Sequence, residues 1–167
     1  MNVHLRIFLA LGLTFGFSNV FSQKPPDTTK INFIKTQYAE INKNLKSYKK
    51  IEKTDTAETT EGNEVLLYYK GNEIKKIATT YYGETGKALY EYYFFNKKLI
   101  FCYFVDYHYN KPFYITGGGK ITSTTEERFY LDNDKILMVK KRPSKSRYFE
   151  EFPIYLRKEA QRLMDLK

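Results

Sequence analysis

Histidine and cysteine are scarce in this sequence, which limits the catalytic chemistry that it can support. There are two histidines and one cysteine in 167 residues. His4 lies in an apolar N-terminal segment, so His108 is the only imidazole left to a folded domain. Asp106 lies two positions before it, and on a strand both side chains would point to one face and could share a metal ion. Zinc requires three or four ligands, and the flanking sequence does not supply the others. We predict no metal site and no cofactor.

A hydrolase would need a nucleophile within reach of His108. Cys102 lies between two aromatic residues in an apolar run, where we expect a small buried residue rather than a reactive thiol. Serines occur at positions 47, 123, 144 and 146, but no nucleophile-elbow pattern surrounds any of them. We favour a protein that is not an enzyme, and we keep as an alternative a small secreted hydrolase that uses His108 with Asp106 or Cys102.

Three consecutive glycines precede Lys120 and suggest a phosphate-binding loop. The P-loop pattern requires a further glycine five residues before the Gly-Lys pair, and a serine or threonine after it. Tyr114 and Ile121 occupy those positions, so the pattern fails twice. We interpret residues 117–119 as a flexible connection between strands.

A basic cluster near the C-terminus is the feature that most strongly suggests binding. Residues 135–147 include six lysines and arginines, and two aromatic residues follow directly. Basic surfaces with aromatic platforms bind single-stranded nucleic acids, and the same charge suits acidic proteins, anionic polymers and lipid headgroups. The residues that we predict to bind are Lys140, Lys141, Arg142, Lys145, Arg147, Tyr148, Tyr107 and Tyr109. A solvated loop that aids solubility is the alternative interpretation.

Residues 1–22 have the three parts of a cleavable export signal. A short segment ends in Arg6, an apolar run follows, and a polar break precedes Val20 and Ser22. These two small side chains occupy the positions that a signal peptidase reads, which predicts cleavage before Gln23. The apolar run has about 11 residues, whereas a membrane-spanning helix needs about 20. We expect no transmembrane segment in the mature chain.

Export determines which partners are available to the protein. The chain carries 28 Lys and Arg against 19 Asp and Glu, a net charge of +9. In the periplasm or outside the cell, an acidic protein or an anionic envelope polymer is a more available partner than nucleic acid. A lipoprotein needs a cysteine at the first mature position, which Gln23 occupies. We therefore predict a periplasmic or secreted protein that is not a lipoprotein.

The mature chain, residues 23–167, has the size of one domain. Apolar residues recur at steps of three and four from Ile31 to Tyr48, which predicts an amphipathic helix of about five turns. Asp27, Thr28 or Thr29 can cap it. We expect this helix to pack on its own sheet, and a coiled-coil seam is the alternative. A second helical stripe, from Phe152 to Leu163, ends the chain.

Between the two helices the hydrophobic period changes to two, as in β-strands. Aromatic residues make up 17% of the sequence and favour strands. Turn signals such as Gly71-Asn72 and Asn96-Lys97 suit tight hairpins. The expected strands are residues 51–56, 65–70, 74–82, 88–95, 99–105, 123–131 and 136–140, with an irregular stretch over 106–120. We predict an α+β fold, an antiparallel meander of about six or seven strands with the N-terminal and C-terminal helices packed on one face.

A repeat runs through the predicted hairpins. Two aromatic residues, one further residue and a turn recur at Tyr68–Asn72, Tyr93–Lys97 and Phe129–Asn133, and the Gly83–Lys87 loop leads to the aromatic segment Glu91–Phe94. These aromatic hairpins resemble exported proteins of Gram-negative bacteria without an assigned function. They are also similar to MORN-like repeat proteins, some of which act as antitoxins or immunity partners. The resemblance covers about residues 64–140, and no functional residue is carried over from it.

The predicted function is a non-catalytic, exported binding or interaction module of the cell envelope, with an acidic protein or polymer as its partner. The net positive charge and the lack of a catalytic set of residues support this prediction. Besides the hydrolase, an immunity or inhibitor protein for a toxin is an alternative.

Overall fold

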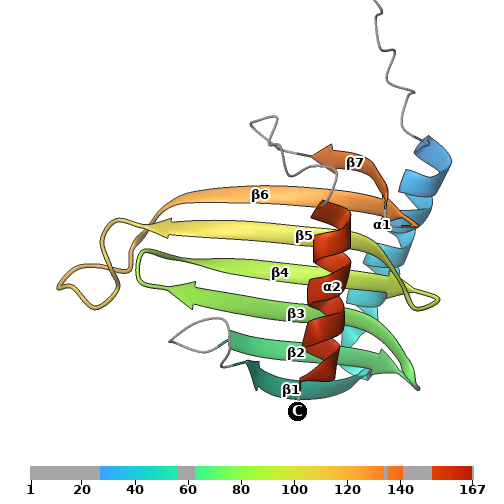
Figure 1. Cartoon of the computed structure of the whole chain (residues 1–167), viewed down its shortest axis with the longest axis horizontal. Helices are drawn as coiled ribbons and strands as arrows, with labels where there is room; N and C mark the ends of the chain where they lie inside the picture. The colour runs from blue at the N-terminus through green and yellow to red at the C-terminus, as the bar shows by residue number, and fades with distance from the viewer. Residues whose placement is uncertain (1–26, 56–62, 134, 141–151, 167) are drawn as a thin grey trace, which may run out of the picture.

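The structure is a computed structural model that describes residues 27–55, 63–133, 135–140 and 152–166. Within these residues seven strands form one antiparallel sheet, in which each strand pairs with the next along the chain (Figure 1). The elements are α1 (Thr28–Lys43), the 3-10 helix η1 (Leu45–Ser47), β1 (Lys49–Asp55), β2 (Asn63–Lys70), β3 (Glu73–Gly83), β4 (Gly86–Phe95), β5 (Lys98–Tyr109), β6 (Ile121–Asp132), β7 (Lys135–Lys140) and α2 (Phe152–Asp165). The predicted α+β meander is confirmed. The predicted export signal lies outside the described residues.

The tight turns of the sheet depend on residues that tolerate a left-handed backbone. Gly71 has a φ of +59°, Asn96 of +48° and Lys97 of +61°. Two consecutive residues in this region give the type I′ turn, whose twist matches that of the strands that it joins. The turn between β4 and β5 has this form, at the position where the sequence predicts it.

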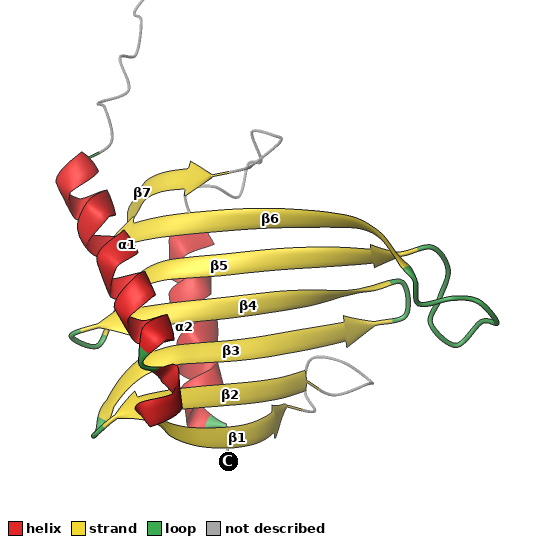
Figure 2. Cartoon of the chain, turned by 180° about the vertical axis from the view of Figure 1, so that it is seen from behind, coloured by secondary structure: helices red, strands yellow, loops and turns green. Residues whose placement is uncertain are grey.

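The two helices cover opposite faces of the sheet, so the prediction that both pack on one face is wrong. Figure 1 shows α2 in front of the strands, and Figure 2, the view from behind, shows α1 in front. Tyr92 belongs to the core under α2 and Tyr93 to the core under α1, and both are completely buried. Successive side chains of a strand point to opposite faces. Because β4 carries aromatic residues on both faces, each face needs its own helix as cover.

Helix α1 begins at a cap that the sequence identifies. The Asp27 carboxylate accepts a hydrogen bond from the backbone N–H of Lys30 at 3.2 Å, which satisfies one of the free donors of the first turn. The side chains that bury α1 against the sheet are Ile31, Ile34 and Ile41. The helix ends at Lys43 and η1 follows, so α1 is shorter than the five turns that the periodicity predicts.

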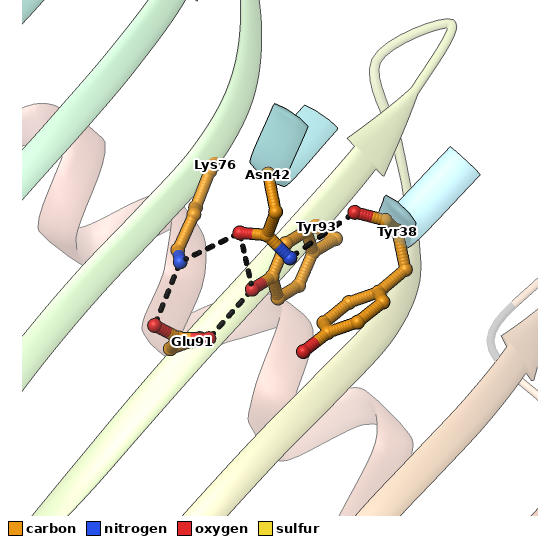
Figure 3. A network of polar contacts seen from close by, with 5 residues as sticks. All are labelled: Tyr38, Asn42, Lys76, Glu91 and Tyr93. Carbon is orange, nitrogen blue, oxygen red and sulfur yellow. Dashed lines mark hydrogen bonds and ion pairs between the residues drawn. The ribbon is translucent and has the colours of Figure 1, made fainter. Parts of the chain in front are cut away.

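A polar network joins α1 to the sheet (Figure 3). The Lys76 ammonium donates to Glu91 Oε1 at 2.7 Å and to Asn42 Oδ1 at 3.2 Å. The Tyr93 hydroxyl donates to Glu91 Oε2 at 2.6 Å, and Asn42 donates to the Tyr38 carbonyl at 3.1 Å. Lys76 is only 5% exposed, so a carboxylate and not water balances its charge. These contacts fix the position of α1 on the sheet.

Helix α2 packs on the other face through the predicted apolar stripe. Its buried residues include Leu156, Ala160 and Leu163. Arg162 Nη2 donates to Asp55 Oδ2 at 2.6 Å and to Glu159 Oε1 at 2.7 Å, and the Tyr81 hydroxyl also donates to Glu159. The apolar stripe and the polar contacts together hold α2 across the sheet. In the described part of the chain, no helix has the length and apolar character needed to cross a bilayer.

Strand β5 continues to Tyr109, so residues 106–109 are not irregular as predicted. Gly86 permits this close pairing, because a Cβ there would lie 2.3 Å from the Tyr107 carbonyl oxygen. The loop that remains, residues 110–120, connects β5 to β6 and is closed by backbone hydrogen bonds such as that from the Gly118 N–H to the Ile115 carbonyl at 2.7 Å; the flexibility predicted over 117–119 stays a prediction. Gly118 packs so closely that a Cβ would lie 2.0 Å from the Pro112 carbonyl oxygen. The glycines therefore specify one loop structure.

Candidate anion-binding site

The structure describes three of the eight predicted binding residues. Lys140 ends β7, and Tyr107 and Tyr109 lie at the end of β5. Lys140 pairs with Arg128 on β6, whereas Tyr107 pairs with Thr124 on the same strand. The four intervening positions correspond to about 13 Å along the sheet, so the structure does not bring Lys140 and Tyr107 into contact. The other predicted residues, which lie outside the described part, are Lys141, Arg142, Lys145, Arg147 and Tyr148.

The tyrosines of β5 have cationic partners within the sheet. The Lys87 ammonium lies 5.3 Å from the ring centre of Tyr107, and the Arg128 guanidinium lies 5.0 Å from that of Tyr103. Both distances are within the range of cation–π attraction. Of these four residues only Tyr107 belongs to the predicted binding set, so the predicted basic and aromatic surface stays a prediction. Lys87 and Arg128 already contact aromatic rings of neighbouring strands.

The residues considered for hydrolysis lie on β5. His108 Nε2 is 3.0 Å from Asp106 Oδ2, and the imidazole side chain is 57% exposed. Cys102 is completely buried, and burial raises the pKa of its thiol well above the ordinary value. It lies six positions before His108, about 20 Å along the strand. The structure thus brings His108 to Asp106 but not to Cys102.

Ser123 lies opposite His108 in the register of β5 and β6 and is exposed. A catalytic group open to water lacks the low-dielectric surroundings that strengthen transition-state electrostatics. Among the described residues, there is no group of three or more His, Cys, Asp or Glu side chains arranged to hold a metal ion. The surroundings of His108 do not supply a built catalytic site.

A cationic pocket of about 510 Å³ lies between α2 and the end of the sheet that carries the β4–β5 and β6–β7 turns. Its described lining residues are Phe94, Lys97, Lys98, Leu99, Asn133, Arg157, Lys158, Gln161 and Met164. Four of these nine are cations, and none is a carboxylate. Phe94 and Leu99 are buried and form an apolar floor. The pocket therefore combines positive charge at its rim with apolar surface below.

The β4–β5 turn supplies the first pair of cations. Asn96 and Lys97 form the type I′ turn described above, and Lys98 begins β5. The Glu73 carboxylate accepts a hydrogen bond from the Asn96 backbone N–H at 3.0 Å and lies 2.8 Å from the Lys75 ammonium. Lys75 is the main cause that lowers the pKa of Glu73, and the backbone N–H groups of the turn add to it. Glu73 thus holds the turn in place from outside the pocket.

The β6–β7 turn orients Lys98. The Lys98 ammonium donates to Asn133 Oδ1 at 2.9 Å, and Asn133 donates to Asp132 Oδ1 at 3.1 Å. Asn133 also has a left-handed backbone, with φ +47°. Lys97 and Asn133, both in the pocket lining, are therefore two of the three non-glycine residues with positive φ in the described chain; the third is Asn96. Such residues persist where the surrounding structure holds them.

Helix α2 supplies the second pair of cations. Arg157 and Lys158 are exposed and belong to the pocket lining. Gln161 lies one turn later and donates to the Asp165 carboxylate at 3.0 Å. The burial of Leu156 and Ala160 fixes which side of the helix faces the turns. The lining is thus assembled from two Lys or Arg pairs that are about sixty positions apart in sequence.

No pattern in the sequence predicts this pocket. The sequence predicts a turn at Asn96-Lys97 and a terminal helical stripe from Phe152 to Leu163, and the structure has both. The only signal was two adjacent cation pairs, and such pairs are common in a chain of net charge +9. Comparison of the chain with protein-family models, with curated proteins and with solved structures found no match.

Proposed function

We propose that this protein is a non-catalytic binding module of the cell envelope that holds an acidic protein or polymer in the cationic pocket. The composition of the pocket carries this proposal, because its described lining contains Lys97, Lys98, Arg157 and Lys158 and no carboxylate. Lysine and arginine form charge-assisted hydrogen bonds with carboxylate and phosphate groups. Cations gathered around a hollow also raise the local concentration of anions. A carboxylate or phosphate of the partner is the group that fits this lining.

The pocket supports binding rather than catalysis. Its described lining has no His, Cys, Asp or Glu, which are the residue types that most often act as general bases or nucleophiles. The apolar floor of Phe94 and Leu99 suits the hydrocarbon part of an acidic residue or of a polymer unit. The proposal includes export and cleavage before Gln23. Acidic proteins and anionic polymers are available as partners in the periplasm and outside the cell.

Titration of the full chain with polyglutamate and with polyphosphate, followed by calorimetry, tests the proposal. The double variant Lys97→Gln/Lys158→Gln removes one cation from each wall of the pocket. We expect its affinity to fall at least tenfold, because a hydrogen bond to a charged group contributes about 1.5–3 kcal/mol and a factor of ten corresponds to about 1.4 kcal/mol. Binding of each polymer, to the native chain and to the variant, should weaken as salt is added.

A matched control distinguishes binding in the pocket from attraction by the net charge of the protein. Lys43 and Lys46 are exposed at the end of α1 and in η1, on the opposite face of the sheet. The variant Lys43→Gln/Lys46→Gln loses the same two charges and should keep its affinity within a factor of about two. Equal weakening in both variants would show that net charge alone attracts the polymer and would refute the pocket as the binding site.

A further inference from the structure

The loop between β5 and β6, residues 110–120, projects beyond the ends of the neighbouring strands (Figures 1 and 2). Three consecutive side chains of this loop are exposed: Phe113 (46%), Tyr114 (63%) and Ile115 (44%). Tyr82 and Ile121, at the adjoining strand ends, are 40% and 51% exposed. Five of the nine exposed large hydrophobic side chains of the described residues are therefore at this one end of the sheet. We call these five residues the apolar tip.

The loop that carries the apolar tip is fixed to the body of the protein. The Phe113 backbone N–H donates to the Glu84 carbonyl at 3.0 Å, which ties the loop to the turn between β3 and β4. Asn110 closes the base of the loop, since its side chain donates to the Gly117 carbonyl at 3.0 Å and accepts from the Lys120 N–H at 3.1 Å. The exposure of the tip is therefore built into the fold.

Charge and shape indicate what the apolar tip contacts. Lys111 and Lys120 flank the loop and are exposed. Two acidic side chains lie beside the loop: the Glu84 carboxylate accepts a hydrogen bond from the Tyr114 hydroxyl at 3.3 Å, and Asp106 Oδ2 lies 3.0 Å from His108 Nε2. A projecting surface with aromatic and aliphatic residues at its summit and lysines around it matches the interface of an anionic bilayer. Tyrosine sits at the headgroup level there, phenylalanine reaches the boundary with the acyl chains, and lysine side chains reach the phosphates.

We propose that the apolar tip is a membrane-docking surface, which inserts Tyr114 and Ile115 into the headgroup layer of a bilayer rich in anionic lipids. The cationic pocket lies at the opposite end of β5. Twelve residues of strand separate the two ends, about 40 Å. A protein docked in this way holds its pocket away from the membrane surface, so the two sites can be occupied together.

The single buried cysteine makes a local test feasible in the full chain. Cys102 is completely buried, so a thiol-reactive fluorophore that responds to polarity will label only an introduced cysteine. We would label Ile115→Cys at the apolar tip and Ile154→Cys on α2, where the native isoleucine is 41% exposed, close to the 44% of Ile115. Each labelled chain is mixed with vesicles of phosphatidylcholine alone or with an added third of phosphatidylglycerol.

We expect the label at position 115 to shift to the blue and brighten severalfold with the anionic vesicles, and to change little with the neutral ones. The label at position 154 should change little with either. A Tyr114→Ser substitution in the Ile115→Cys chain should weaken the response, and added salt should weaken it too. An unchanged label at 115, equal responses at 115 and 154, or equal responses to neutral and anionic vesicles would each overturn the proposal. None of these results bears on the pocket, because its test with polyglutamate uses no vesicles.

Discussion

Lys97 occupies a backbone position that glycine would occupy at lower energy. Its φ of +61° puts the side chain in the left-handed region, which costs a residue with a Cβ about 1–2 kcal/mol. Asn96, the other residue of the turn, tolerates the same region better because its short amide can bond locally. Strained backbone conformations cluster at functional sites. Lys97 lies in the lining of the cationic pocket, where its ammonium group can bind an anion.

Replacement of Lys97 with glycine should therefore change stability and binding in opposite directions. We expect Lys97→Gly to raise the free energy of unfolding by about 1 kcal/mol, since relief of the strained φ outweighs the added flexibility of the unfolded chain. The same variant should bind polyglutamate more weakly. Urea denaturation and calorimetry measure the two effects. Asn96→Gly is the control and should gain less stability; a larger gain for Asn96→Gly than for Lys97→Gly would contradict the explanation.

At the scale of elements, α2 depends on a carboxylate as well as on its apolar stripe. Hydrogen bonds from Arg162 and Tyr81 hold the pKa of Glu159 below its ordinary value of 4.5, although partial burial opposes this. A carboxyl group whose pKa is lower in the folded state stabilises that state above its unfolded pKa. This contribution disappears as the pH falls through the lower, folded value. The contact of α2 with the sheet is therefore sensitive to acid.

We predict that the free energy of unfolding falls as the pH is lowered below 4.5, and that Glu159 contributes to the slope. Glu159→Gln should reduce stability at pH 7 and flatten this acid dependence, because glutamine does not titrate. Urea denaturation between pH 7 and pH 3 measures both. Lys158→Gln, next in sequence but outside this network, should leave the slope unchanged. Equal slopes for Glu159→Gln and the native chain would show that other carboxylates account for the acid dependence.

At the scale of the whole molecule, the sheet separates two aromatic cores. Tyr92 and Phe129 lie under α2, and Tyr93 and Phe101 lie under α1. The Tyr93 ring centre is 5.6 Å from that of Phe101, a distance typical of favourable aromatic pairs. Two helices thus suffice to cover a seven-stranded sheet near one end, and the other end carries the apolar tip.

Alkaline titration should report this burial of tyrosine. Burial raises the pKa of Tyr92 and, together with Glu91, that of Tyr93. A raised pKa favours the neutral phenol in the folded state, so the stabilisation is complete below the ordinary value of 10 and is lost as the pH rises above it. We predict that exposed tyrosines ionise first, and that the buried ones ionise only as the chain unfolds.

Ultraviolet absorbance of tyrosinate, recorded with circular dichroism, follows both steps. The second absorbance rise should coincide with the loss of the sheet signal. If all 16 tyrosines ionised in one gradual step while the sheet signal persisted, the aromatic cores would be more open to water than the structure shows. Denaturant at neutral pH provides the reference absorbance of the fully unfolded chain.

The sequence by itself determined the elements of this protein and their order. The period of two in the strands, the left-handed turn residues and the Asp27 cap act through local geometry, so they can be read from neighbouring residues. The predicted meander and both helices were therefore correct. The length of β5 was underestimated, because Asp106, Tyr107 and His108 pair with β4 through the close approach that Gly86 allows.

Only the tertiary structure decided which face each helix covers and where the cationic pocket lies. Alternation along a strand shows that Tyr92 and Tyr93 point to opposite faces, but not that a different helix covers each one. The pocket joins Lys97-Lys98 in a turn to Arg157-Lys158 in α2. No local pattern links two segments so far apart in sequence. Their proximity results from the packing of α2 across the sheet, which depends on long-range burial rather than on the residues of either segment.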